Sequence, residues 1–182
     1  GAVMPGTKPR IHELDFCSQI AGAVNHLVGQ NPAIYPFNEA RVEGFGTGAA
    51  LSKRKDLRFF DHHGKLVLCG EVKLPGTPEG QSAVNQKVMA DAAAKADDAG
   101  VQYFFTWNVN EFALWDRSQW DKPWFERRVC LWRLARFLAG PEDVAREDNL
   151  NFIKTKFLPD LLRDLADIIS GRRPDWAMPP DD

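Results

Sequence analysis

The sequence has no apolar run long enough to cross a bilayer, few cysteines and no excess of positive charge. A membrane-spanning helix needs about 20 consecutive apolar residues; no segment of the 182 residues approaches that, and no signal-peptide pattern opens the chain. The three cysteines, Cys17, Cys69 and Cys130, are scattered and lack metal-site spacing, which is typical of buried thiols in a reducing compartment. We therefore expect a cytoplasmic protein.

The charge and composition set limits on the class of protein. The formal net charge is −2, so any affinity for nucleic acid must come from a local basic patch. With 44% hydrophobic and 26% charged residues, the chain has the composition of one globular domain with a real core. We expect this domain over residues 11–170. Residues 1–10 are predicted to be disordered or left over from cloning, and residues 171–182 to form a linker-like tail.

The most informative segment runs from Asp56 to Lys73 and has the pattern of a β-hairpin. If His63-Gly64 is a two-residue turn, the pairing places Asp56 directly opposite Glu71. Glu71 and Lys73 then share a strand face, because successive side chains alternate. Two carboxylates this close repel each other unless a cation lies between them, and Mg²⁺ needs only one or two protein carboxylates. An ordinary cross-strand lysine–acid pair on a solvated face is an equally good interpretation of the spacing alone.

Other polar residues of the hairpin compete for these roles. Asp61 lies at the turn, about 17 Å along the strand from the level of Glu71, so Asp56 is the better ligand candidate. His62 and His63 fall in the same turn and are interpreted as loop residues, not as a zinc site or a general base.

The spacing of Asp56 and the run Glu71-Val72-Lys73 at the end of an apolar strand resembles the PD-(D/E)XK nuclease superfamily, which has the restriction-endonuclease-like fold. The segment from Leu66 to Gly76 is similar to the nuclease domains of multi-domain restriction enzymes. Lys55 stands where the motif has proline, which is not a ligand. The resemblance implies a core of order αβββαβ, in which a mixed central sheet is flanked by helices, with additional C-terminal helices.

The resemblance also implies an activity and its residues. Asp56, Glu71 and the Val72 carbonyl would bind Mg²⁺, for which Mn²⁺ could substitute, with Glu13 as a further ligand, and Lys73 would be the catalytic lysine. The expected function is a DNA endonuclease of a restriction–modification or defence system, acting as a homodimer on DNA and linked to further domains or subunits of helicase or methyltransferase type. A catalytically silent DNA-binding or assembly module of the same fold is the alternative.

The flanking segments fit this element order. Helical periodicity begins at Ile11 and places Glu13 on the core side of the first helix, although a frayed first turn stabilised by the helix dipole would explain Glu13 as well. A second helix is predicted over 82–98, with Gln86 beside its inner face as an accessory residue or an ordinary surface glutamine. Strands are predicted over 101–107 and 112–115, and strand, helix, strand indicates a right-handed parallel crossover.

Two basic groups are candidates for contacts with DNA. The run Lys53-Arg54-Lys55 precedes Asp56 and is either a phosphate contact or a solvated face. A helix is predicted over 126–138, with Arg128, Arg133 and Arg136 around an exposed Trp132 as a nucleic-acid surface, a solvated face or a subunit contact. Another amphipathic helix is predicted over 150–169.

Overall fold

A computed structural model describes residues 11–43 and 56–172 of the chain. The helices are α1 (Glu13–Gln30), α3 (Gln86–Ala99), α4 (Pro141–Ala145), α5 (Glu147–Phe152) and α6 (Leu158–Ile169). The strands are β1 (Glu39–Val42), β2 (Leu57–Phe60), β3 (Leu66–Val72), β4 (Tyr103–Trp107), β5 (Glu111–Asp116) and β6 (Arg128–Arg133). Short 3-10 turns over Pro78–Gly80 and Trp124–Arg127 and a π-helical turn over Ile153–Phe157 lie among the connections.

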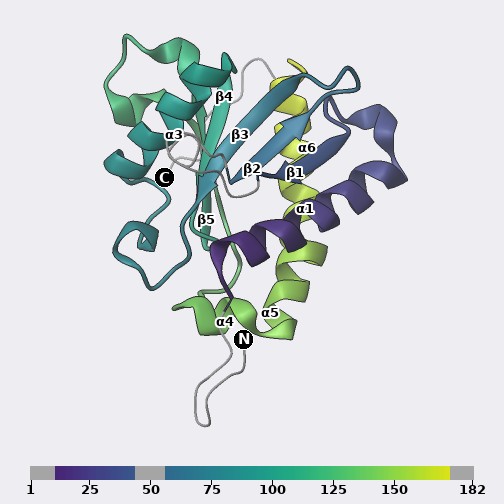
Figure 1. Cartoon of the computed structure of the whole chain (residues 1–182), viewed down its shortest axis with the longest axis vertical. Helices are drawn as coiled ribbons and strands as arrows, with labels where there is room; N and C mark the ends of the chain where they lie inside the picture. Colours follow the sequence, from purple (N-terminus) through teal and green to yellow (C-terminus); the bar gives the residue numbers. More distant parts are fainter. Residues whose placement is uncertain (1–10, 44–55, 173–182) are drawn as a thin grey trace.

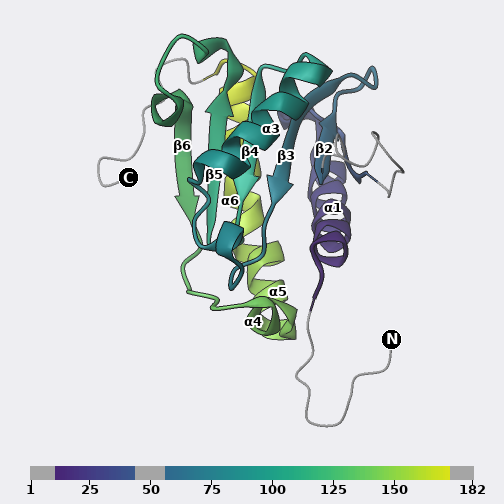
Figure 2. The same ribbon diagram turned by 60° about the vertical axis from the view of Figure 1, so that its left-hand side comes forward.

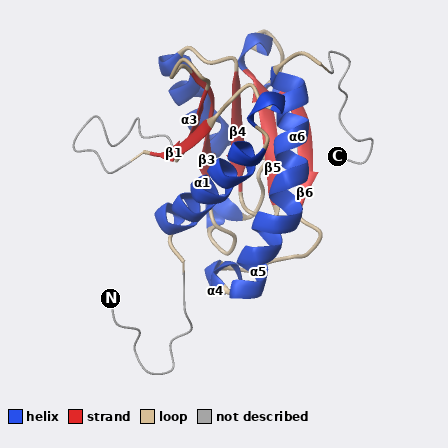
Figure 3. Cartoon of the chain, turned by 90° about the vertical axis from the view of Figure 1, so that its right-hand side faces the viewer, coloured by secondary structure: helices blue, strands red, loops and turns tan. Residues whose placement is uncertain are grey.

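The described strands form one six-stranded mixed sheet in the order β1-β2-β3-β4-β5-β6. Neighbours pair antiparallel except β3 and β4, which are parallel and joined through α3. Figure 1 shows the sheet with helices on both sides; α3 crosses one face (Figure 2), and α1 and α6 lie together over the other (Figure 3). The predicted αβββαβ order and mixed sheet are confirmed, with β5, β6 and the C-terminal helices added to that core.

The central strand β3 is apolar on both faces because helices cover both. Leu68 and Val72 are fully buried in the core between the sheet and helices α1 and α6, whereas Cys69 belongs to the core under α3. The next residue along β3 has to be glycine, because a Cβ on Gly70 would lie 2.4 Å from ring atoms of Phe105 on β4. The two faces of β3 are therefore fixed, which decides where the next polar side chains point.

The β2–β3 turn differs from the two-residue turn predicted at His63-Gly64. Asp61 N–H donates to the Lys65 carbonyl at 2.8 Å and Gly64 N–H donates to the Asp61 carbonyl at 3.0 Å, which leaves a three-residue loop. Gly64 has φ of 76°, as a type I turn closed by a glycine bulge requires. His62 and His63 are exposed loop residues, as expected.

A β-bulge compensates for the register shift that the extra loop residue causes. The pairing shifts between Phe59 and Phe60, where the partner changes from Leu68 to Leu66. Beyond the bulge, the strands run in the register that the two-residue turn would have given. The turn was predicted wrongly, and the pairing next to Asp56 was predicted correctly.

The helix predicted over 126–138 is wrong. Residues Arg128–Arg133 form β6, which pairs antiparallel with β5, and a 3-10 turn precedes it. The apparent helical spacing arose because both faces of β6 are covered: Leu131 is buried under α3, and Trp132 packs against the core on the α6 side. Leu134 and Leu138, in the loop that follows the strand, are buried on the α6 side as well. Apolar residues on two faces of a strand, followed by a loop, imitate the single stripe of a helix.

The helix predicted over 150–169 is confirmed, as α5, the π-helical turn and α6 follow one another along the same path. The buried side chains of α6, among them Leu158, Leu162 and Leu165, belong to the core beneath the sheet. Among the described residues, no helix is both long and apolar enough to cross a membrane.

Candidate active site

The β2–β3 pairing determines the position of Asp56 relative to Glu71. Leu57, the first residue of β2, pairs with Gly70, so one further step along the register brings Asp56 opposite Glu71. Asp56 is only 8% exposed, and its Oδ2 accepts a hydrogen bond of 2.8 Å from the Val72 backbone N–H. Just before β2 begins, the Asp56 carboxylate therefore accepts the β3 hydrogen bond that a backbone carbonyl would accept within the sheet.

Glu71 points toward α3, because it lies two residues after Cys69 on the same face of β3. It is 3% exposed. Lys95 on α3 donates a hydrogen bond to its Oε1, and the Lys73 Nζ lies 3.9 Å from its Oε2. Burial raises the pKa of Glu71, and the charge of Asp56 raises it further, while Lys95 and Lys73 act in the opposite direction. Glu71 is thus a buried carboxylate that needs positive charge nearby.

Lys73 follows the last residue of β3 and is surrounded by acids. Its backbone N–H donates to the Trp107 carbonyl at 2.9 Å, and its Nζ lies 3.4 Å from Oε2 of Glu79. Burial alone would lower the pKa of Lys73, but the charges of Glu13, Glu71, Glu79 and Asp56 together raise it. The side chain retains 27% exposure, so a protonated ammonium faces solvent from the edge of the acidic cluster.

Glu13 begins α1 and is half-buried, and it is the acid with the largest effect on the pKa of Lys73. The first helix therefore delivers a carboxylate to the neighbourhood of the candidate site, as its place on the core side of the helix predicted. Within residues 11–43 and 56–172, however, no three His, Cys, Asp or Glu side chains are grouped closely enough to hold a metal ion together. A role for Glu13 as a metal ligand stays a prediction.

Two residues at the site were not predicted from the sequence. Lys95 is 17% exposed and contacts Glu71, and Glu79 joins Lys73 to Lys87, whose Nζ lies 2.5 Å from Oε1 of Glu79. Lys95 had a signal: it lies seven residues after Val88, within the stripe that buries α3 against the sheet, where a lysine requires an acidic partner. Glu79 had none, because its position depends on the 3-10 turn Pro78–Gly80.

The donor set at the site consists of the two carboxylates and the Val72 carbonyl. Oxygen ligands of this kind, few in number, fit a cation that keeps water in its coordination shell, such as Mg²⁺, better than zinc, which prefers nitrogen and sulfur.

The remaining predicted residues lie in different places. Gln86 is exposed at the first position of α3, whose buried side is formed by Val88, Met89, Ala92 and Ala96, so its position gives no support to an accessory role. Lys53, Arg54 and Lys55 lie outside the described residues.

The predicted cluster of arginines around an exposed Trp132 is wrong, because its helix is a strand. Arg128 and Arg133 stand at opposite ends of β6, and Arg136 lies in the loop beyond it. Trp132 is half-buried, and its Nε1–H donates to Oδ2 of Asp164 on α6 at 2.8 Å. Arg133 pairs with Glu111 at 3.5 Å, so this tryptophan does not present a stacking surface between basic side chains.

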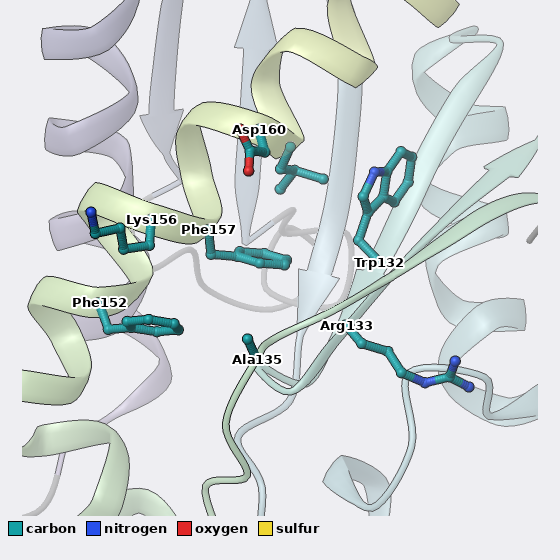
Figure 4. A pocket seen from close by; sticks show the side chains of 8 residues that line it. Trp132, Arg133, Ala135, Phe152, Lys156, Phe157 and Asp160 are labelled. Atoms are coloured by element: carbon teal, nitrogen blue, oxygen red, sulfur yellow. The ribbon is translucent and has the colours of Figure 1, made fainter.

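A pocket of about 470 Å³ lies between the end of β6 and helices α5 and α6. Its walls are mainly apolar, formed by the rings of Trp132, Phe152 and Phe157, and the Arg133 guanidinium points away from these rings (Figure 4). Trp132 and Phe157 pack against the core on the α6 side of the sheet, whereas Glu71 faces α3. The pocket is therefore not part of the acidic cluster.

Comparison with known proteins gives one informative similarity. No family model and no curated protein matches the sequence. Among solved structures, the fold is similar to that of the type IIG restriction endonuclease BpuSI, with a TM-score of 0.59 and 13% sequence identity. The match covers 93% of this chain and 19% of that chain, so this chain corresponds to a small part of the larger protein. The chain has a restriction-endonuclease-like fold.

Proposed function

We propose that the chain is a PD-(D/E)XK-type nuclease domain that hydrolyses phosphodiester bonds in DNA with the help of Mg²⁺. The observation that carries this proposal is the convergence of Asp56, Glu71 and Lys73 at the end of β3, in a register that continues the β2–β3 pairing. The similarity to a restriction endonuclease supports it at the level of fold.

In this proposal Asp56, Glu71 and the Val72 carbonyl hold the metal ion. Bound Mg²⁺ supplies a coordinated water of lowered pKa and positive charge for the transition state. Glu71 Oε1 accepts from Lys95, which has to release it to the cation, whereas Asp56 is already oriented by the Val72 N–H before any ligand arrives. Fixed groups of this kind cost no reorganisation during the reaction.

Lys73 acts on the phosphate. Its ammonium stays protonated at neutral pH because the surrounding acids raise its pKa, and it remains partly exposed. It donates hydrogen bonds to the attacking water and to the phosphoryl oxygens on which charge builds up. Interactions that strengthen in the transition state raise the rate of the chemical step.

We further propose a biological setting. The chain would be the nuclease module of a restriction or defence protein, associated with domains or subunits of helicase or methyltransferase type. Cleavage of both DNA strands requires two sites, which favours a homodimer on DNA.

The test is a cleavage assay on double-stranded DNA with and without Mg²⁺ or Mn²⁺. Glu71→Gln is the informative variant, because it keeps the shape of the side chain and removes the charge that a cation needs. Metal-dependent cleavage by the wild type and none by Glu71→Gln is expected. Equal cleavage by both proteins, or cleavage that persists in EDTA, would contradict the proposal.

One observation favours the alternative of a silent binding module: the Lys95 ammonium already neutralises Glu71. A silent module would bind DNA without cleaving it at any metal concentration. The same assay, run beside a binding measurement, separates the two functions.

A further inference from the structure

We infer that Phe137, Arg133 and Arg136 form a nucleotide-binding subsite next to the candidate active site, in which Phe137 stacks on a base and the arginines face the DNA backbone. The inference rests on the proposed nuclease function and deepens it. We call these three residues the Phe137 subsite.

The subsite has an exposed aromatic ring that the fold does not need. Phe137 is 81% exposed, more than any other large apolar side chain in the part of the chain that the structure describes. It lies between Leu134 and Leu138, which are buried, and the loop is held by hydrogen bonds between Asn110 and the Leu138 backbone at 2.8 and 2.9 Å. The ring is therefore presented to solvent by a fixed segment of backbone.

The two arginines are positioned around a hollow beside this ring. Arg133, Arg136 and Phe137 line a space of about 450 Å³, a volume typical of small-molecule sites. The other residues of its lining are Gln81, Asn108, Asn110, Leu134 and the acid Glu111. The Arg136 guanidinium lies 3.7 Å from the centroid of the Phe152 ring, and its Nη1 donates to Oδ1 of Asn149 at 3.0 Å. An arginine fixed in this way loses little freedom when it meets a phosphate.

The sheet connects this hollow to the candidate active site. The Lys73 N–H donates to the Trp107 carbonyl at the end of β4, and the Asn108 N–H donates to the Glu111 carbonyl at the start of β5. Glu111 is in turn the register partner of Arg133 on β6, so Lys73 and Arg133 lie on one row across four strands. Three strand spacings make this row about 14 Å long. Because each strand of DNA rises about 3.4 Å per nucleotide, that distance corresponds to a few nucleotides.

The chemistry of the hollow favours nucleic acid over a protein partner. Arg133 keeps 49% side-chain exposure but Glu111 offsets its charge, so the exposed Arg136 supplies the net positive charge beside the ring. Aromatic side chains beside arginine are the usual means of holding an unstacked base and its phosphate. A contact between proteins would instead bury Phe137 in a larger apolar surface.

The experiment measures DNA binding in EDTA, which prevents metal-dependent cleavage, with 2-aminopurine placed at successive positions of the duplex. Phe137→Ala should weaken binding about 5- to 150-fold, the range for loss of one stacked base, and remove a fluorescence change confined to one position. Phe137→Trp should restore both signals. Arg133→Gln should lower the salt dependence of binding by about one ion.

Phe125→Ala is the matched control, because Phe125 is 56% exposed and lies before β6, at the end of that strand remote from Phe137. If the wild type cleaves DNA while Phe137→Ala binds as tightly as Phe125→Ala does, the subsite is refuted and the nuclease proposal stands. If Phe137→Ala instead abolishes self-association measured by sedimentation and leaves DNA binding unchanged, the surface is a protein contact and the subsite is refuted. A wild type that neither binds nor cleaves DNA overturns both proposals.

Discussion

The hydrogen bond between Asp56 and the Val72 N–H allows the structural and the chemical roles of Asp56 to be separated. The two informative changes are Asp56→Ala, which removes the acceptor, and Asp56→Asn, which removes only the charge. The Val72 N–H lies beyond the end of β2, so Asp56 is the acceptor that satisfies it. Only the asparagine variant can maintain that bond.

The magnitudes follow from this contact. An unsatisfied buried N–H costs about 1–3 kcal/mol, and about 1 kcal/mol lowers Tm by about 2–4 °C in a chain of this size. Asp56→Ala should therefore lose about 2–12 °C, less whatever it gains by relieving the repulsion with Glu71. Asp56→Asn keeps the acceptor and exchanges the lost repulsion with Glu71 against the lost attraction to Lys73, so its Tm should stay close to that of the wild type.

The assay is differential scanning calorimetry with and without millimolar Mn²⁺, followed by DNA cleavage. Wild type should be stabilised by Mn²⁺, and neither variant should respond to it or cleave DNA. An asparagine variant as unstable as the alanine variant would refute the role given to this hydrogen bond. A metal-induced shift that survives in both would remove Asp56 from the metal site.

Three further changes test other residues of the chain. Lys73→Met should slow single-turnover cleavage by about 10²-fold or more with little loss of DNA affinity; an unchanged rate with enzyme in excess would exclude Lys73 from the chemistry. Lys95→Met removes the ammonium that contacts Glu71, so calorimetric titration should show tighter Mn²⁺ binding, and weaker binding would contradict competition between the lysine and the cation. Hydrogen bonds from the Lys65 and His63 N–H groups lower the pKa of Asp61 in the folded protein. The ionised Asp61 therefore stabilises the fold above the pKa of an unfolded aspartate, and this stabilisation is lost as the pH falls through the folded pKa. Asp61→Asn should consequently lower Tm at neutral pH and match the wild type in strong acid, and a Tm difference independent of pH would contradict this assignment.

The sequence predicts the central part of the fold because β3, α3 and β4 have uninterrupted patterns of their own. An apolar strand, a helix with a C-terminal glycine and a second apolar strand permit few arrangements. The secondary structure of β6 was predicted wrongly, because residues buried on both sides of an edge strand show no period of two. Leu134 and Leu138, which follow the strand, gave the apolar positions an apparent spacing near four residues, as in a helix.

The candidate site was predicted to the extent that it depends on strand register. Asp56, Glu71 and Lys73 are close in a single hairpin, and two errors in that hairpin, the turn length and the missing bulge, cancelled each other. Lys95 and Glu79 reach the site from a helix and a 3-10 turn, so their contacts depend on tertiary packing. Arginines 128, 133 and 136 were grouped by a helical period that the structure does not have.

The charges at the site also change an argument that the sequence alone suggested. Two neighbouring carboxylates imply a cation if nothing else balances them, but Asp56 and Glu71 are accompanied by Lys73 and Lys95, so these four charges sum to zero without a metal ion. The fold can therefore tolerate both acids before any ligand binds, and their proximity by itself does not require Mg²⁺. What distinguishes a nuclease from a silent module is whether Lys95 gives up Glu71 to a cation, because a carboxylate held permanently by an ammonium cannot also bind a metal ion fully. Lys95, which has no place in the short motif, is thus the residue on which the choice between the two functions depends.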